Sequence, residues 1–530
     1  MASSAPMGTA GTSGPGRRRW SRPRVALAVG SVVLALGGLV SGDVAERADL
    51  AGTARGDGHP AEPGRSPAGR QGAGRGDPDR RDRHDGPGEG SGTPGAPAGA
   101  LTGLGDPYFP DAGNRGYDVA HYDLELRWHP ARQRMQGVTR LTATATADLE
   151  AFALDAVGLD VATVEVDGAR ATATPRGRRD LVVVPPAPLA AGHRFTTVVT
   201  YAAAPGQVGG VDLLDPGWVA DGEEVYAAFE PHGAATLFPS NDHPRDKATF
   251  TFRVTVPRGL DVAANGLLRE RVPGEGTTTF VYDAPDPMAT YLVQVVIADL
   301  DLVESRGPGG LPVRHAVDAD VGGIGDGPVA LTGRMLEVYE DLFGPYPFVG
   351  YGVVVVDQLL GFALETQTLS LVDADAARSE STLAHELAHQ WFGNAVTPAS
   401  WQDIWLNEGF ATYAELLWSE RVGEGGPADL VASARSPRLD LPPGDPGPAD
   451  LFAPAVYERG ALALHVLDRT VGRRTFLDVL RTWVARHGGG SASTAQFEAL
   501  AEEVSGCELT PLFDAWLRAP VLPRLSDWLG

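Results

Sequence analysis

Cysteine is almost absent from this sequence of 530 residues, in which Cys507 is the single example. One cysteine cannot form an intrachain disulfide, and it excludes cysteine-based metal clusters and Cys-x-x-Cys redox sites. We expect Cys507 to behave as a small apolar residue that is buried or partly buried. Lysine is equally scarce, because Lys247 is the one lysine among the Lys and Arg residues. This bias towards arginine indicates a GC-rich genome more than a function.

Positive charge is also scarce after the first 105 residues. The formal net charge of the chain is −24, and residues 1–105 contain 13 Arg against 10 Asp and Glu, so the remainder carries −27. A strongly acidic body argues against nucleic acid or an anionic membrane surface as a partner. The negative charge favours binding partners with cationic groups, such as the α-amines of peptides.

The N-terminal residues contain a basic run followed by an apolar run. Residues 1–24 end in an arginine-rich stretch, and residues 25–42 are mostly apolar and uncharged up to Val40. This pattern is typical of a signal anchor or a signal peptide with its positive side inside. Charged residues crowd the position of a cleavage site, which favours an uncleaved anchor over cleavage. Residues 43–105 are rich in Gly, Pro, Ala, Arg and Asp, and we expect them to form a disordered linker.

Residues 106–305 alternate between apolar and polar positions, which is typical of half-buried β-strands. The clearest alternating segments are residues 122–128, 138–144, 195–201 and 250–256. Turns rich in Pro, Gly and Asp separate them. We therefore predict an N-terminal all-β domain over residues 106–305.

Residues 306–530 have a mixed pattern. We expect a strand at residues 353–357 and a loop at residues 426–454. Helices are expected at residues 329–343, 459–471, 474–487, 494–505 and 509–519. The sequence thus predicts an α+β multidomain protein, in which the all-β domain precedes a mixed, mostly helical domain.

Residues 385–389 read His-Glu-Leu-Ala-His and form the most informative stretch of the chain. Side chains four apart on an α-helix lie on the same face, one turn apart, so His385 and His389 can bind one metal ion. Glu386 lies beside the first ligand, where its carboxylate can reach a water molecule without binding the ion. Ser379 before the pentad and Gly393 after it are typical helix start and stop residues.

A third ligand follows in the segment Trp-Leu-Asn-Glu-Gly-Phe-Ala at residues 405–411. Glu408 lies nineteen residues after His389, an interval that fits a loop and the start of a second helix over residues 407–421. From the first turn of that helix, the Glu408 carboxylate could face the two histidines. Two histidines and one glutamate suit Zn²⁺, and we expect one zinc ion per chain.

The pentad and the Trp-Leu-Asn-Glu-Gly-Phe-Ala segment together resemble the M1 family of zinc aminopeptidases. The resemblance extends from about Tyr117 to the C-terminus. It implies a saddle-shaped N-terminal β domain and a thermolysin-like catalytic domain, without the C-terminal helical domain of long family members. It also implies that His385, His389 and Glu408 hold the zinc ion.

The resemblance implies three further functional residues. Tyr457, in Val-Tyr-Glu-Arg-Gly-Ala, matches the tyrosine that stabilises the oxyanion. Glu365 and Glu230 match residues that bind the substrate amine. Around Glu365 the segment departs from the family pattern Gly-x-Met-Glu-Asn, because Phe362 replaces the usual Gly and Thr366 the usual Asn. These departures affect the expected contacts to the substrate.

The remaining polar candidates carry weaker signals. We expect Asn394 and Asp403 to contact the metal-ligating groups. The three other histidines that we considered lack metal-ligand spacing and are expected to be structural. They are His232, His243 and His465.

The sequence predicts a zinc aminopeptidase that removes N-terminal residues from peptides, with Glu386 as base and acid. Its expected partners are peptides with a free N-terminus, and it is expected to be a monomer that meets the membrane only through its N-terminal segment. The catalytic domain would lie outside the cell, or be secreted if the signal is cleaved. The alternatives are an endopeptidase or an epoxide hydrolase on the same zinc core, and an inactive, membrane-anchored peptide-binding protein.

Overall fold

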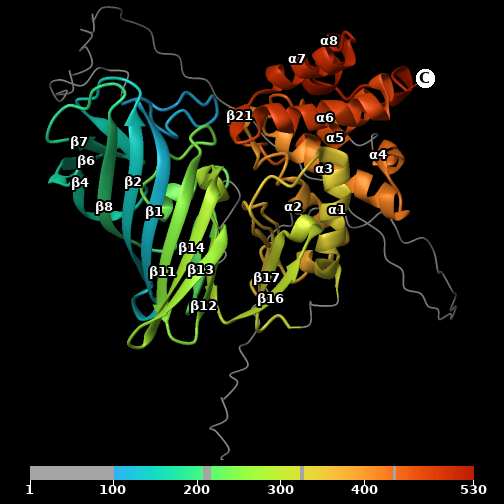
Figure 1. Ribbon diagram of the computed structural model, residues 1–530. Helices are drawn as coiled ribbons and strands as arrows, with labels where there is room; N and C mark the ends of the chain where they lie inside the picture. The colour runs from blue at the N-terminus through green and yellow to red at the C-terminus, as the bar shows by residue number, and fades with distance from the viewer. Residues whose placement is uncertain (1–100, 207–215, 323–326, 434–436, 530) are drawn as a thin grey trace, which may run out of the picture.

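The computed structural model describes residues 101–529, with gaps at 207–215, 323–326 and 434–436. The expected membrane segment at residues 25–42 and most of the expected linker lie outside these residues. No helix in the described part of the chain is both long enough and apolar enough to span a membrane. The described residues form a β-strand region, drawn in blue to green in Figure 1, and a largely helical region drawn in yellow to red.

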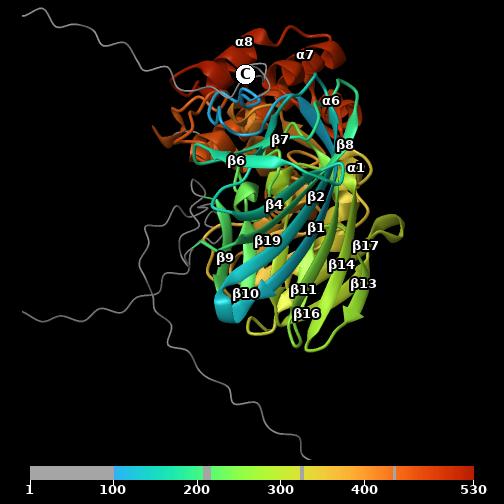
Figure 2. The same ribbon diagram turned by 90° about the vertical axis from the view of Figure 1, so that its left-hand side faces the viewer.

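An eight-stranded sheet dominates the β-strand region. Its strand order is β13-β14-β11-β1-β2-β8-β4-β5, and Figure 2 shows it face on. The strands are β1 (Tyr117–His129), β2 (Arg134–Ala145), β4 (Asp160–Val166), β5 (Ala169–Arg170), β8 (Arg194–Ala203), β11 (Ala248–Pro257), β13 (Leu267–Pro273) and β14 (Thr277–Met288). The four alternating segments of the sequence lie in β1, β2, β8 and β11. Alternate residues of β1, such as Tyr122, Leu124 and Leu126, are buried because one face of the strand packs on the core.

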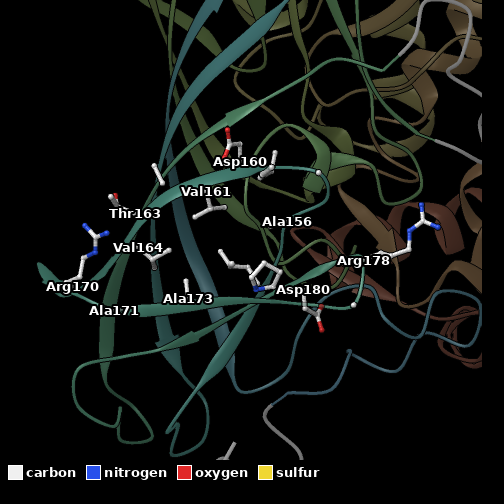
Figure 3. A pocket seen from close by; sticks show the side chains of 16 residues that line it. Ala156, Asp160, Val161, Thr163, Val164, Arg170, Ala171, Ala173, Arg178 and Asp180 are labelled. Atoms are coloured by element: carbon white, nitrogen blue, oxygen red, sulfur yellow. The ribbon is translucent and has the colours of Figure 1, made fainter. Parts of the chain in front are cut away.

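Two smaller sheets complete this region. The strands of the first are β3 (Phe152–Asp155), β7 (Asp180–Val184) and β6 (Thr172–Arg176). The strands of the second, in order, are β12 (Asp261–Ala264), β15 (Val295–Ala298), β10 (Glu224–Ala228) and β9 (Gly217–Asp221). A hollow of about 540 Å³ lies between β4 and the β6–β7 hairpin and is lined by side chains such as Val164 and Ala173 (Figure 3). None of its lining residues is a predicted site residue.

A second four-stranded sheet begins the second region. Its order is β16 (Leu300–Arg306), β17 (Pro312–Asp318), β18 (Val353–Val356) and β19 (Ser370–Asp373). The predicted domain boundary at residue 305 falls near the end of β16. Side chains of this sheet pack against the β12-β15-β10-β9 sheet in a separate hydrophobic core. This core joins the two regions.

Eight α-helices follow β17 in the described residues. They are α1 (Thr332–Phe343), α2 (Glu380–Ala388), α3 (Trp405–Val422), α4 (Pro427–Ser433), α5 (Gly460–Val471), α6 (Arg473–His487), α7 (Thr494–Ser505) and α8 (Thr510–Phe513). π-Helical turns occupy Ala455–Arg459 and Asp514–Arg518, and β20 (Val396–Pro398) pairs in parallel with β21 (Gly490–Ala492).

Two expectations from the sequence differ from the structure. The segment 426–454 was expected to be a loop, but it contains α4, because Pro427 is tolerated in a first helical turn and the residues after it include good helix formers. Cys507 was expected to be at least partly buried, but it is exposed. It follows Gly506, whose left-handed backbone (φ 67°) ends α7, so the chain turns there towards solvent.

Candidate metal centre

Helix α2 presents both histidines of the pentad on one face. Its first turn is capped by Ser379, whose side chain accepts a hydrogen bond from the Thr382 N–H at 3.2 Å. His385 and His389 lie at the other end of the helix with their ring centroids 4.6 Å apart. Gly393 ends the following turn with φ 123°, and a Cβ there would lie 3.3 Å from the His389 ring. The glycine therefore lets the chain pass close beside the second histidine.

Glu408 meets these histidines from the first turn of α3. Its Oε2 lies 3.3 Å from His385 Nε2 and 3.6 Å from His389 Nε2. One ligand atom from each of the three residues lies within 4.8 Å of the others, and all three residues are buried. Two imidazole nitrogens and one carboxylate, converging in this way, form the donor set of a zinc site that leaves a fourth position open. The arrangement therefore fits one Zn²⁺ ion.

The second nitrogen of each histidine is held by a neighbouring acceptor. His389 Nδ1 lies 3.1 Å from the Phe392 carbonyl oxygen, which can only accept, so Nδ1 carries the proton and Nε2 keeps its lone pair. His385 Nδ1 lies 2.6 Å from Glu415 Oε1. Such partners fix the tautomer and the ring orientation of a metal-binding histidine. Glu415 was not found from the sequence, although it follows Glu408 by seven residues and so faces the same side of α3.

Of the two residues that were expected to contact the metal-ligating groups, Asn394 does so and Asp403 does not. Asp403 accepts hydrogen bonds from the backbone and hydroxyl of Thr494 and contacts none of the metal-binding side chains. Asn394 donates from its side chain to the Glu365 carbonyl at 2.7 Å. Its backbone N–H also donates to the His389 carbonyl at 2.9 Å. Asn394 thus links the second histidine to the segment that carries Glu365.

Glu386 is buried next to the three converging ligands. Its Oε2 atom has no hydrogen-bond partner in the described part of the protein. Burial raises the pKa of Glu386 to about 8, an effect that the nearby histidines oppose. Burial also raises the pKa of Glu408, but the adjacent His389 and His385 reverse this effect and bring that pKa to about 2. The environment therefore drives the pKa values of the two carboxyl groups apart. Such a difference is expected when one group is a base and the other a permanently charged ligand.

Glu230 and Glu365 approach the same point from two other segments. Glu230 follows β10 of the β-strand region, whereas Glu365 precedes β19 of the second region. Oxygen atoms of Glu230, Glu365 and Glu408 lie within 4.8 Å of one another. Glu230 Oε1 and Glu365 Oε1 are both buried, and neither has a hydrogen-bond partner among the described residues. Burial, together with the charges of Glu365 and Glu408, holds the pKa of Glu230 well above its usual range.

Tyr457 packs against the His385 ring. It comes from the π-helical turn before α5, and its ring is stacked on His385 with centroids 6.1 Å apart and planes inclined by 23°. Burial and the neighbouring Glu408 raise the pKa of Tyr457 well above its usual value, so its hydroxyl keeps its proton. The structure thus brings all seven predicted site residues together. His232, His243 and His465 take no part in this cluster and contact other groups, such as Arg179 at His232.

Two histidines, a glutamate from the next helix and an adjacent free glutamate define a site of the zinc metallopeptidase class. Comparison with known proteins is more specific. Residues 329–440 match the Peptidase family M1 domain, and residues 119–292 match the Peptidase M1 N-terminal domain. An M1 zinc metallopeptidase structure from Deinococcus radiodurans is 36% identical, with a TM-score of 0.75, and the match covers 81% of this chain and 99% of that one. The chain belongs to the M1 peptidase family.

Longer relatives match over part of their length. Aminopeptidase M1 of Arabidopsis thaliana is 29% identical over 56% of this chain and 37% of its own length. Endoplasmic reticulum aminopeptidase 1 of Homo sapiens is 27% identical over 69% of this chain and 43% of its own length. The chain therefore spans less than half the length of these two relatives.

Proposed function

We propose that the protein is a zinc-dependent aminopeptidase that removes N-terminal residues from peptides. The observation that carries this proposal is the pair of buried, unpartnered oxygens on Glu230 and Glu365 beside the metal ligand Glu408. A buried carboxylate is stable as an anion only when a cation or hydrogen-bond donors meet it. The α-ammonium group of a peptide supplies both a charge and three donors, and carboxylates bind it by charge-assisted hydrogen bonds.

Each residue of the site has a role in this reaction. A bound zinc ion supplies the Lewis acidity that activates water and polarises a carbonyl group. Glu386 takes a proton from the attacking water and delivers it to the leaving amine. Tyr457 donates a hydrogen bond to the oxyanion as it forms, since its hydroxyl keeps its proton at neutral pH. Glu230 and Glu365 hold the N-terminus, so that the first peptide bond lies nearest Glu386.

Similar structures support a peptide substrate. One structure of the Deinococcus radiodurans enzyme, 35% identical with a TM-score of 0.74, is described as bound to a Tyr-Ser-Ala substrate. A further similar structure, 35% identical with a TM-score of 0.73, is that of a two-domain M1 zinc metallopeptidase bound to L-arginine. A tripeptide and a free amino acid are the kinds of molecule that an aminopeptidase binds as substrate and releases as product.

The role of Glu386 is tested by Glu386→Gln. The amide keeps the size of the side chain but cannot accept the proton, so we expect hydrolysis of aminoacyl-arylamides to fall by about 10²–10⁴-fold or more. Metal analysis should still find one zinc per chain, because Glu386 is not a ligand. Full activity in this variant would refute the assignment.

The exopeptidase assignment is tested by Glu230→Gln and Glu365→Gln. Both variants should lose activity on substrates with a free N-terminus, mainly through a higher KM, because the ammonium loses a charged partner. The matched control is Glu337→Gln on the exposed face of α1, which should behave as wild type. If wild type cleaves N-blocked peptides as well as free ones, and the Glu365 variant keeps that activity, the site is that of an endopeptidase.

The cellular setting that we propose is the outer side of the cytoplasmic membrane, with the chain as a monomer attached through residues 25–42. Its support is the basic run before this apolar segment and the scarcity of basic residues after residue 105. Fractionation of expressing cells, with protease added to intact cells, tests the location. Recovery of all the protein in the cytosol would refute it. Light scattering of the purified protein gives the oligomeric state.

A further inference from the structure

Acidic residues gather at a second place in the described structure, away from the zinc ligands. Carboxylate oxygens of Glu224, Asp318 and Asp320 lie within 4.8 Å of one another. Glu224 begins β10, whereas Asp318 ends β17 and Asp320 follows it. The cluster therefore lies where the β12-β15-β10-β9 sheet meets the β16-β17-β18-β19 sheet. Figure 1 shows β16 and β17 at the lower end of the second region.

One oxygen of this cluster is buried without a partner. Asp318 is 3% exposed, and its Oδ2 atom has no hydrogen-bond partner among the described residues. Its other oxygen, Oδ1, accepts the backbone N–H of Asp320 at 2.9 Å. A buried carboxylate oxygen without a donor is unfavourable unless the group is protonated or a cation binds it. The buried Asp318 oxygen therefore indicates a bound cation, which an exposed acidic cluster alone would not.

Negative charge surrounds the buried carboxyl group. Burial raises the pKa of Asp318, and the charges of Asp357, Asp320 and Asp299 raise it further. Asp357 directly follows β18, which pairs in parallel with β17, and Asp299 lies in the short link between β15 and β16. Several chain segments thus bring acidic residues to one point, where a cation would relieve their mutual repulsion.

We propose that Glu224, Asp318 and Asp320 form a second metal site, which binds a hard divalent cation of the calcium or magnesium type. Carboxylate oxygens are the ligands that these ions prefer, and each of the three residues offers one to the cluster. Asp318 is buried, Glu224 half-buried and Asp320 exposed, so water molecules can complete the coordination from the open side. Histidine and cysteine are absent from this set, which distinguishes it from the zinc site.

A cation at this position would fasten two segments that lead to the substrate-binding glutamates. Glu224 starts the strand β10, which runs directly into Glu230. Gln358 donates from Nε2 to Glu224 Oε2 at 2.6 Å and belongs to the segment that leads to Glu365. The ion would thus stabilise the junction between the two regions.

The test uses the full chain loaded with one zinc ion and kept in metal-depleted buffer. Titration with CaCl₂ and, separately, with MgCl₂ by calorimetry should show one saturable site, with a Kd of about 1 mM or lower for one of the ions. At a hundredfold excess over Kd, that ion should raise the Tm by about 3 °C. The zinc content, measured in parallel, should remain one per chain.

Variants separate this site from general attraction to an acidic protein. Asp320→Asn and Asp318→Asn should each weaken binding at least about tenfold, since each removes a charged ligand. Asp320 is exposed, so its variant should fold normally even if the buried change disturbs the chain. Asp301→Asn, at an exposed position of β16, is the matched control and should bind as wild type. Absence of saturable binding, or equal binding by all three variants, would overturn the proposal.

Discussion

At the scale of single residues, His315 on β17 links the stability of the fold to pH. It is 5% exposed, and its Nδ1 accepts the Val353 N–H at 3.2 Å, so the ring is neutral in the folded protein. Burial lowers the pKa of His315 to about 4, from 6.5 in an unfolded chain. Between pH 6.5 and pH 4 the unfolded state therefore binds a proton that the folded state does not. The contribution of the neutral His315 ring to the free energy of unfolding is therefore fully present above pH 6.5 and is lost as the pH falls towards 4.

Replacing His315 with Asn should remove this acid sensitivity, because the Asn side-chain oxygen can accept the same N–H but does not titrate. A pKa difference of two to three units corresponds to about 3 kcal/mol. Urea unfolding at pH 7 and pH 4 should therefore show a loss of stability that is smaller by about this amount in His315→Asn than in wild type. His129→Asn, on the hairpin between β1 and β2, is the control. If both variants lose as much stability as wild type, the assignment is wrong.

The sequence predicted that His385, His389 and Glu408 would converge, because their positions are set by local geometry. His385 and His389 share a helix face through their spacing alone, and Glu408 lies in the first turn of the next helix. Glu415 was missed, although seven residues on a helix bring two side chains within about 20° of each other around the axis. The Phe392 carbonyl could not be foreseen, because the turn after α2 that directs it towards His389 depends on tertiary packing.

At the scale of elements, two glycines bring α3 against the start of α5. A Cβ atom on Gly409 would lie 2.9 Å from Gly460 Cα, and one on Gly460 would lie 3.0 Å from Gly409 Cα. Real Cβ atoms essentially never come within 3.0 Å of a backbone atom, so position 409 requires glycine, whereas a Cβ on Gly460 would force the Gly409 backbone to shift slightly. Glu408 directly precedes Gly409, and Tyr457 lies one turn before Gly460. The contact therefore sets the distance between a metal ligand and the proposed oxyanion donor.

Gly409→Ala should push these two helices apart and move Glu408 away from the histidines. Overpacking of this kind costs about 1–3 kcal/mol, and we expect a lower Tm together with weaker zinc binding. Zinc retention during dialysis against a competing chelator measures the second effect. The control is Gly333→Ala on α1, where a Cβ meets no atom within 4 Å and should leave both properties intact. Wild-type zinc retention in Gly409→Ala would show that α3 is not held by this contact.

The sequence predicted most helices within a few residues, because their ends carry chemical signals. Gly423 ends α3 with a left-handed backbone, and Ser493 caps α7 in a capping box with Gln496. Strand positions were also predicted from alternation. The strand order was not, because alternation gives the face of a strand but not its neighbour. The parallel pairing of β1 with β11, which are more than 100 residues apart, is an example.

At the scale of the whole molecule, the proposed substrate site depends on both regions. Glu230 comes from the β-strand region, whereas Glu365 and the zinc ligands come from the second region. No local pattern could show that these segments meet, and only the family resemblance indicated it. The junction of the two regions therefore borders the proposed catalytic site. Its hydrogen bonds include those of Tyr291, which donates to the Gly393 carbonyl at 3.0 Å beside the second histidine.

Lys247, the one lysine of the chain, joins the two regions at this junction. It directly precedes β11, and its Nζ donates to the Asn394 and Ala395 carbonyls at 2.8 and 2.9 Å. Lys247→Met keeps the length of the side chain but leaves both carbonyls without this donor. Burial lowers the pKa of Lys247 to about 7, so the amine is only partly charged near neutral pH. A hydrogen bond contributes about 1 kcal/mol, and we expect the loss of two to lower the free energy of unfolding by about 2 kcal/mol.

The form of the unfolding transition tells how far this loss extends. If the regions unfold as one unit, Lys247→Met lowers a single Tm, because the junction stabilises both regions equally. If the two regions unfold separately, calorimetry shows two transitions, and Lys247→Met increases the difference between their Tm values. Since the core between the two four-stranded sheets is continuous, we expect one transition at lower temperature. Arg253→Met on β11, which removes an exposed ion pair with Asp123 on β1, should change stability by less than about 1 kcal/mol. An equal effect of both substitutions would mean that the Lys247 hydrogen bonds do not hold the regions together.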